Sequence, residues 1–248
     1  MFKQANGVRY VRFLLDILEK NVFHWYLEVG CRSGRIFGNS RGKTIAVDPY
    51  FQVQSNVINV KPELHVFQKT SDDFFASNFL DAIDAKLSFS FLDGMHLFEY
   101  LLRDFIATER NSTPDSVIAL HDCCPFTYEM TTRDLDNLPD GNWTGDVWKI
   151  IPILKKYRPD LNVSVLDAAP TGLVLVSGLD PKSRILPNAY EDIVDEFTNL
   201  DLETFGLKKF GELFDYQSAK ALMAEGHTFS DKITLPPDLV LTPNKITP

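Results

Sequence analysis

The feature that most constrains this chain is the segment at residues 25–34, WYLEVGCRSG, in which an apolar run ends in an acid and two glycines. A continuous apolar run of this length is typical of a central strand in a parallel sheet that is covered on both faces. Gly30 and Gly34 indicate a tight turn, because glycine adopts positive φ and leaves room for a ligand beside the backbone. The segment therefore predicts a buried strand followed by a ligand-binding turn.

A second strand is predicted at residues 44–47, TIAV, and it ends in Asp48. A carboxylate on the strand beside a glycine-rich turn can accept hydrogen bonds from the two hydroxyls of a ribose. The glycine spacing is E-x-G-x-x-x-G, whereas a dinucleotide fingerprint needs G-x-G-x-x-G to hold a pyrophosphate at a helix N-terminus. Glu28 heads the pattern, and a carboxylate there repels phosphates and favours a cationic nucleoside ligand.

Polar side chains follow two further predicted strands at the point where each strand ends. Asp93 and His96 come after the run AKLSFSFL, and His121 and Asp122 come after the run DSVIAL. Open α/β sheets bind their ligands at the carboxyl ends of the strands, so we expect these four side chains to form one cluster there. For either histidine alone, the alternative is a hydrogen-bonded polar residue with a structural role.

In order and spacing, these motifs resemble those of class I S-adenosylmethionine-dependent methyltransferases, in particular the small-molecule O-methyltransferase-like group called methyltransferase family 24. The resemblance covers roughly residues 22–178 and includes the runs FLDGMHLFEYLLRDF, IALHDCCP and GDVWKIIPILKKYRP. It implies an α/β fold with a Rossmann-like, doubly wound, mostly parallel sheet that closes with one antiparallel strand. The runs NVSVLDA and TGLVLVSG, separated by Ala169 and Pro170, are the predicted closing hairpin.

The resemblance implies that the cofactor is S-adenosylmethionine and that the methyl acceptor is a small hydroxylated molecule, such as a sugar or a secondary metabolite. Asp48 would bind the ribose. The third strand is one of the runs NVINV and LHVFQKT, with LHVFQKT favoured, and the loop after it would contact the adenine. Helix capping explains Ser71 and Asp72 of that loop equally well, with Ser71 as the N-cap. The residues predicted to bind the cofactor are Glu28, Gly30, Arg32, Ser33, Gly34, Asp48, Ser71, Asp72 and Asp93.

Methyl transfer to a hydroxyl needs a deprotonated and aligned oxygen, which either a general base or a divalent cation can provide. His96 and His121 are the candidate bases, and Asp93 is the carboxylate beside them. The metal ligands of the metal-dependent relatives match Asp93, His121 and Asp122 of this chain. A histidine stands where those relatives have an acid or its amide, so the sequence leaves open whether magnesium, manganese or no metal binds.

Alternatives to methyl transfer stay open at the level of sequence. The same fold could bind the nucleoside without transferring a methyl group, as a sensor or accessory protein, or could carry out other metal-assisted chemistry. An NAD-dependent dehydrogenase is a third hypothesis, which the missing third glycine of the dinucleotide fingerprint weakens.

Three segments lie outside these motifs. Residues 8–20 have helical apolar periodicity and are predicted to cover the core. Residues 126–145 lack periodicity and form either a lid over the acceptor or an ordinary surface loop anchored by Trp143. We predict a methyltransferase domain at residues 1–178 and a helical extension with a tail at residues 179–248. The extension could cover the cleft, mediate homodimerisation or lie along the core.

Charge and composition restrict the partners and the compartment. The net charge of −9 and the pI near 5.0 argue against a nucleic-acid substrate. No apolar run reaches the length of a membrane span, so we expect no membrane partner. The three cysteines have neither disulfide nor zinc-ligand spacing, which favours the reducing cytoplasm.

Overall fold

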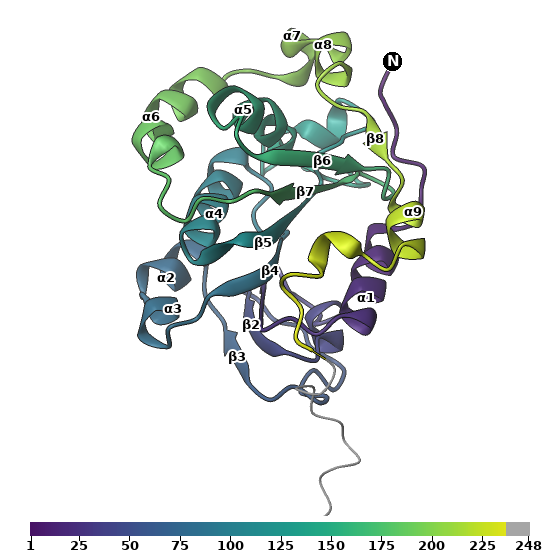
Figure 1. Ribbon diagram of the computed structural model, residues 1–248. Coiled ribbons are helices and arrows are strands. Elements are labelled where there is room, and N and C mark those ends of the chain that lie inside the picture. The colour runs from purple at the N-terminus through teal and green to yellow at the C-terminus, as the bar shows by residue number, and fades with distance from the viewer. Residues whose placement is uncertain (237–248) are drawn as a thin grey trace, which may run out of the picture.

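A computed structural model describes residues 1–236 as a mostly parallel sheet with helices on both faces (Figure 1). The strands are β1 (Trp25–Val29), β2 (Lys43–Val47), β3 (Leu64–Phe67), β4 (Leu87–Leu92), β5 (Ser112–His121), β6 (Asn162–Leu166), β7 (Leu173–Ser177) and β8 (Tyr216–Gln217). The α-helices are α1 (Tyr10–Lys20), α2 (Ser71–Ala76), α3 (Phe79–Ala82), α4 (Phe98–Arg110), α5 (Ile150–Tyr157), α6 (Ile185–Phe197), α7 (Leu202–Phe205), α8 (Leu207–Gly211) and α9 (Ala219–Ala224).

The order of the strands in the sheet is β3-β2-β1-β4-β5-β7-β6-β8. The first five therefore follow the doubly wound order 3-2-1-4-5, and they all run parallel. β7 runs antiparallel to both of its neighbours, β5 and β6. The predicted Rossmann-like sheet, its third strand at β3 and its closing hairpin are confirmed.

Every residue of β1 and β4 is buried, because these two strands lie at the centre of the sheet and are covered on both faces. Side chains alternate along a strand, so Trp25, Leu27 and Val29 pack into the apolar cluster beneath α4 and α5. Tyr26 packs into the opposite cluster, beneath α1. Glu28 has the same parity as Tyr26, so its carboxylate lies on the α1 side of the sheet.

The predicted helix near the N-terminus is confirmed as α1, and it begins at Tyr10 because the residues before it pair with the turn between β6 and β7. Gly7 donates its backbone N–H to Asp167 at 2.7 Å, and Ala169 donates to Val8 at 2.8 Å. Figure 1 shows α1 and α9 on one face of the sheet and α4, α5 and α6 on the other. The start of α1 is thereby tied to the end of the sheet where β5 finishes.

The predicted helix after β3 is confirmed as α2, but Ser71 is not its N-cap. Thr70 takes that position with an extended backbone, and its Oγ1 accepts the backbone N–H of Asp73 at 3.1 Å. Threonine and serine both cap through a short side-chain hydroxyl, so the sequence pattern fits either residue. Ser71 is the first helical residue instead.

The elements that follow β7 pack on the same core. α6 contacts α4 and α5, β8 extends the sheet beside β6, and α9 contacts α1. His227 Nε2 lies 2.8 Å from Asp16 Oδ2, which joins this region to α1. The division into residues 1–178 and 179–248 stays a prediction, and residues 237–248 of the predicted tail lie outside the described residues.

The cysteines and the membrane-spanning potential of the helices can be read directly from the structure. Cys31, Cys123 and Cys124 are buried free thiols. Within the part of the chain that the structure describes, no helix is both long enough and apolar enough to cross a membrane.

Candidate active site

A cavity of about 970 Å³ opens at the carboxyl ends of β1, β2 and β4. This is where an open α/β sheet binds its ligand. All the predicted cofactor-binding residues except Gly34 line the cavity. These lining residues are Glu28, Gly30, Arg32, Ser33, Asp48, Ser71, Asp72 and Asp93. The sequence motifs therefore converge on one cavity.

The two glycines of the turn after β1 have the predicted positive φ, 85° at Gly30 and 75° at Gly34. The close approach that they permit is to the chain itself. A Cβ on Gly30 would collide with the carbonyl oxygen of Asp93, and one on Gly34 would lie 2.6 Å from Cγ1 of Val57. Gly30 thus allows the end of β4 to pack against the turn, which brings Asp93 next to the first motif.

The carboxylate of Asp48 is held by two backbone amides. Its Oδ2 accepts the N–H of Arg32 at 2.7 Å, and its Oδ1 accepts the N–H of Tyr50 at 2.7 Å. A carboxylate oxygen can accept two hydrogen bonds, so each oxygen retains capacity for a ligand hydroxyl. This preorganised acceptor pair suits the predicted ribose contact.

Glu28 is a buried acid at the floor of the cavity, with only 1% of its surface exposed. Burial raises its pKa to about 8, and the charge of Asp93 contributes to the rise. The Tyr26 hydroxyl donates a hydrogen bond to Oε2 at 2.6 Å, which acts in the opposite direction. A carboxylate in this environment is stabilised by a cationic partner, so the cavity favours a ligand with a positive charge.

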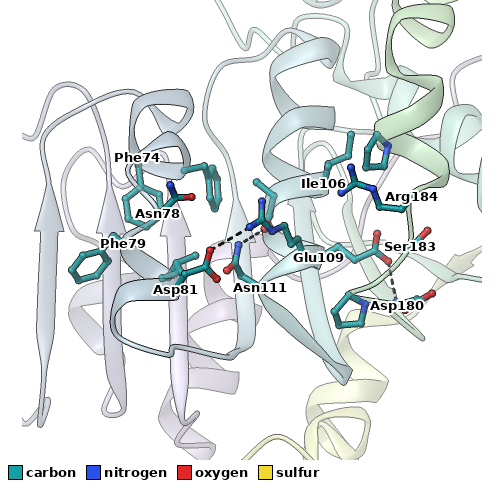
Figure 2. A pocket seen from close by; sticks show the side chains of 16 residues that line it. Phe74, Asn78, Phe79, Asp81, Ile106, Glu109, Asn111, Asp180, Ser183 and Arg184 are labelled. Atoms are coloured by element: carbon teal, nitrogen blue, oxygen red, sulfur yellow. Dashed lines mark hydrogen bonds and ion pairs between the residues drawn. The ribbon is translucent and has the colours of Figure 1, made fainter.

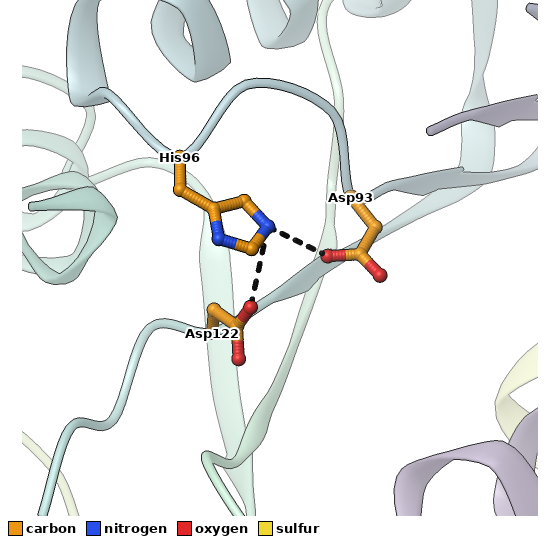
Figure 3. Close-up of side chains that lie close together, drawn as sticks. All are labelled: Asp93, His96 and Asp122. Carbon is orange, nitrogen blue, oxygen red and sulfur yellow. Dashed lines mark ion pairs between the residues drawn. The ribbon is translucent and has the colours of Figure 1, made fainter. Parts of the chain in front are cut away.

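The predicted polar cluster is present at the ends of β4 and β5 (Figure 3). His96 Nε2 lies 3.5 Å from Asp93 Oδ1 and 3.3 Å from Asp122 Oδ2. Each of these three residues offers one ligand atom, and the three atoms lie within 4.8 Å of one another. Burial opposes the charged form of His96, but its hydrogen bond with Asp93 and the charge of Asp122 outweigh this and raise its pKa. The cluster can hold a proton or a cation.

The orientation of His96 follows from its contact with Trp143. His96 Nδ1 lies 2.8 Å from the carbonyl oxygen of Trp143, and because a carbonyl only accepts, Nδ1 carries the hydrogen. The two rings pack with centroids 5.0 Å apart. Nε2 is therefore the nitrogen that faces Asp93 and Asp122.

His121 lies behind this cluster with both ring nitrogens engaged. Nδ1 is 3.1 Å from Asp93 Oδ1 and 3.4 Å from Asp122 Oδ2. Thr171 donates its hydroxyl hydrogen to Asp122 Oδ1 at 2.6 Å, so its oxygen accepts from His121 Nε2 at 3.3 Å. Burial disfavours the charge, but Asp122 and Asp93 outweigh it and raise the pKa of His121 to about 10. The predicted roles of His121 as base or ligand stay predictions, and this geometry favours His96 for both.

The loop after β3 borders the cavity. Arg103 binds Asp72 through two hydrogen bonds, of 2.8 Å and 2.7 Å, which fix the orientation of that carboxylate. Thr70 and Ser71 line the cavity beside it. Adenine binding by this loop stays a prediction.

The segment at residues 126–145 is held in place by contacts of Trp143 and Arg133. Trp143 donates its Nε1–H to the carbonyl of Thr132 at 2.9 Å and lines the cavity. Arg133 pairs with Glu99 of α4 and with Asp146, and Asp146 accepts the first N–H of α4 at 2.8 Å. Trp143 is thus a packing anchor that also forms one wall of the site.

Among the residues that sequence reasoning missed, three reach the site from the first helix and the last hairpin. Tyr10 and Val11 line the cavity, so α1 does more than cover the core. The Tyr10 ring lies against His121, with centroids 3.7 Å apart. Thr171 joins His121 to Asp122 from the β6–β7 turn. No sequence signal marks these residues, because they reach the site from distant segments of the chain.

A second cavity, of about 240 Å³, lies between α2, α3, α4 and the segment before α6 (Figure 2). Apart from Arg184, its charged side chains bind neighbouring protein groups. Arg110 pairs with Asp81 at 3.3 Å, and Glu109 accepts the N–H of Asp180 at 3.1 Å. None of the predicted site residues lines this cavity.

Comparison with known proteins finds similarity in structure alone. The chain matches no protein-family model and no curated protein. Cofactor-bound Rv0187 from MTB is 11% identical, with a TM-score of 0.49 over 69% of this chain and 81% of that one. The O-methyltransferase from Bacillus cereus in complex with SAH is 14% identical, with a TM-score of 0.43 over 67% and 79%. A third similar structure is MycE from the mycinamycin biosynthetic pathway, in complex with Mg, SAH and mycinamycin VI. It is 13% identical, with a TM-score of 0.45 over 70% of this chain and 49% of MycE. This chain therefore spans about half the length of MycE.

Proposed function

We propose that this protein is an S-adenosylmethionine-dependent methyltransferase that methylates a hydroxyl of a small molecule, such as a sugar or a secondary metabolite. The observation that carries the proposal is the placement of Glu28, Asp48 and Asp93 around one cavity. Asp48 offers fixed acceptors for two ribose hydroxyls, and Glu28 offers a buried carboxyl group whose ionised form a cationic ligand would stabilise. When bound, the cofactor would supply an electrophilic methyl group.

The acceptor hydroxyl would lie beside His96, which lines the cavity and whose Nε2 faces Asp93 and Asp122. As a general base, His96 in its neutral form would take the hydroxyl proton at Nε2, because its hydrogen bond to the Trp143 carbonyl keeps the other ring hydrogen on Nδ1. Asp93 and Asp122 would then stabilise the imidazolium that forms.

A divalent cation, magnesium or manganese, also fits this cluster. Asp93, His96 and Asp122 would hold it through two carboxylate oxygens and one imidazole nitrogen. Histidine ligands normally donate their other ring N–H to a carbonyl or carboxylate, as His96 does to Trp143. A cation there would lower the pKa of the acceptor hydroxyl and fix its position.

We also propose that the protein acts in the cytoplasm on a small-molecule acceptor, without nucleic acid or membrane as a partner. The buried free thiols and the acidic charge support this. Homodimerisation through the elements after β7 is a further proposal.

Calorimetry with S-adenosylhomocysteine and NADH tests the cofactor. Asp48→Ala should weaken S-adenosylhomocysteine binding by at least ~1.5 kcal/mol, since hydrogen bonds to a charged group are lost. Asp84→Ala, at an exposed aspartate, is the matched control. Binding of NADH but not of S-adenosylhomocysteine would instead support a dehydrogenase.

Release of S-adenosylhomocysteine in a coupled assay over a panel of sugars and phenols tests the transfer. A chelator that abolishes this activity, with magnesium or manganese restoring it, would identify a metal at the cluster. A structure with bound S-adenosylmethionine whose methyl group is closed off from any acceptor space would instead support a nucleoside-binding protein without transferase activity.

A further inference from the structure

The two ring nitrogens of His96 compete for a single hydrogen when the imidazole is neutral. Carboxylate oxygens of Asp93 and Asp122 lie 3.5 Å and 3.3 Å from Nε2, and they attract the hydrogen to that nitrogen. The carbonyl oxygen of Trp143, 2.8 Å from Nδ1, attracts it to the other nitrogen. A general base and a metal ligand both need the lone pair on Nε2. The position of the Trp143 carbonyl therefore decides whether His96 can act in either role.

Residues 143–146 wrap around His96. The backbone N–H of Asp146 donates to the His96 carbonyl oxygen at 3.1 Å. Gly145 lies so close to the same carbonyl that a Cβ on it would collide with the oxygen. The Trp143 and His96 rings pack with centroids 5.0 Å apart. A shift of this short segment would thus move the carbonyl that orients the imidazole.

Trp143 and Thr144 are held by the earlier part of the loop at residues 126–145. The Trp143 indole N–H donates to the carbonyl of Thr132 at 2.9 Å. The backbone N–H of Thr144 donates to the carbonyl of Met130 at 2.9 Å. The Trp143 carbonyl therefore stays in place only while the earlier part of the loop is fixed.

Arg133, the residue after Thr132, fixes the loop to the first turn of α4. Its guanidinium donates two hydrogen bonds to the Glu99 carboxylate, of 3.0 Å and 2.7 Å, and another to Asp146. Asp146 is 2% exposed and also accepts a hydrogen bond from the Lys149 ammonium group at 2.6 Å. The two cations balance the two carboxylates, and among these four charged side chains only Arg133 belongs to the loop.

We propose that Arg133 is a positioning residue for His96, which fixes the loop so that the Trp143 carbonyl keeps the ring hydrogen on Nδ1 and leaves the Nε2 lone pair free. This inference rests on the proposed function and deepens it, because it identifies a remote side chain on which the chemistry depends. Arg133 lies outside the lining of the large cavity, so it acts through the loop and not on a ligand. Without its guanidinium the loop moves, and the carboxylates beside Nε2 draw the hydrogen to that nitrogen.

Nitrogen NMR of isotopically labelled histidines tests the proposal, because it distinguishes a protonated ring nitrogen from an unprotonated one. Spectra of the unsubstituted protein, recorded over a pH series up to the neutral imidazole, should show the His96 hydrogen on Nδ1. Arg133→Met should convert this single tautomer into a mixture with the Nε2–H form. Arg133→Lys keeps the charge and should shift the tautomers less. The signals that disappear in His96→Gln identify His96.

Steady-state kinetics give a second readout. In Arg133→Met, kcat should fall about tenfold or more, because a small displacement of a general base costs rate. The affinity for S-adenosylhomocysteine, measured by calorimetry, should stay within about twofold of that of the unsubstituted protein, since Arg133 does not line the cofactor cavity.

Arg110→Met is the matched control, because Arg110 of α4 also pairs with a carboxylate, that of Asp81 at 3.3 Å, and has 62% of its side chain exposed. It should change neither the tautomer nor kcat. Trp143→Phe keeps a ring beside His96 but loses the N–H to Thr132, and it should shift the tautomer in the same direction. This variant decides the question if a thermal melt shows that Arg133→Met does not fold.

An Nε2–H tautomer in the unsubstituted protein would overturn the proposal. An unchanged His96 tautomer in the folded Arg133 variants would also overturn it, even if kcat fell. If the tautomer shifts in Arg133→Met but the unsubstituted protein methylates no acceptor, the positioning of His96 by Arg133 stands and the proposed function fails.

Discussion

His96 Nδ1 lies 2.8 Å from the carbonyl oxygen of Trp143, a contact that spans 47 residues of sequence. It ties the segment of residues 126–145 to the end of β4. It also determines which nitrogen of His96 faces Asp93 and Asp122. A main-chain group in a segment without periodicity therefore orients the side chain on which the proposed chemistry depends.

His96→Gln should reduce kcat roughly 100-fold or more, the usual contribution of a general base or of a well-placed ligand. The affinity for S-adenosylhomocysteine should change by less than about twofold, because His96 acts on the acceptor side of the site. Steady-state kinetics and calorimetry separate the two effects. His65→Gln is the control, since His65 of β3 pairs with Glu63 and lies away from the cavity. Full activity in His96→Gln would make the cluster structural.

Gly30→Ala should destabilise the protein by roughly 3 kcal/mol or more, because a Cβ at positive φ would also collide with the Asp93 carbonyl. Gly141→Ala is the matched control, since a Cβ there meets nothing within 4 Å. That variant should stay within about 0.5 kcal/mol of the unsubstituted protein. Urea unfolding measures the free energy of unfolding of both variants. Equal values for the two would contradict the packing of the end of β4 against the turn after β1.

Thr171→Val should cost about 1–3 kcal/mol of unfolding free energy, because buried groups of His121 and Asp122 would each lose a hydrogen-bond partner. Thr171→Ser keeps the hydroxyl and should recover most of the loss. Denaturant titrations of the two variants provide the comparison. A valine variant as stable as the serine variant would show that the hydroxyl bridge contributes nothing.

Asp104→Asn should stabilise the protein at pH 8 but not at pH 4. Burial raises the pKa of Asp104 to about 7, so the folded state retains this proton while the unfolded state has lost it. Stability therefore falls as the pH rises from the unfolded pKa to about 7, and the amide removes this loss. The gain should be roughly 3 kcal/mol at pH 8. Thermal melts of the variant at pH 8 and at pH 4 measure this gain in stability. Asp84→Asn, at an exposed aspartate, is the control. An equal gain in stability at pH 4 would show that the pKa of Asp104 is not raised.

Much of the fold could be predicted from local sequence. The apolar run before Gly30 identifies a central strand, because strands covered on both faces are apolar without alternation. The run before Asp93 alternates with serines at first and then becomes apolar, and it identifies a strand whose end carries an acid. Parallel strands carry their last residues to one edge of the sheet, so Glu28, Asp48 and Asp93 had to meet there. The acid-lined cavity thus follows from strand order and from residue type alone.

The tertiary structure decided the orientation and the partners of these groups. Successive side chains of a strand point to opposite faces, yet His121 and Asp122 join the same cluster, since Asp122 has a φ of 59° and its carboxylate lies beside the His121 nitrogen that also contacts Asp93. Tyr10 and Thr171 reach the cluster from the first helix and the last hairpin. Such contacts depend on backbone dihedrals and on chain segments far apart in sequence, which local patterns do not encode. The sequence by itself determined which chemical groups gather at the sheet edge, and only the packed chain decided which histidine faces the cavity.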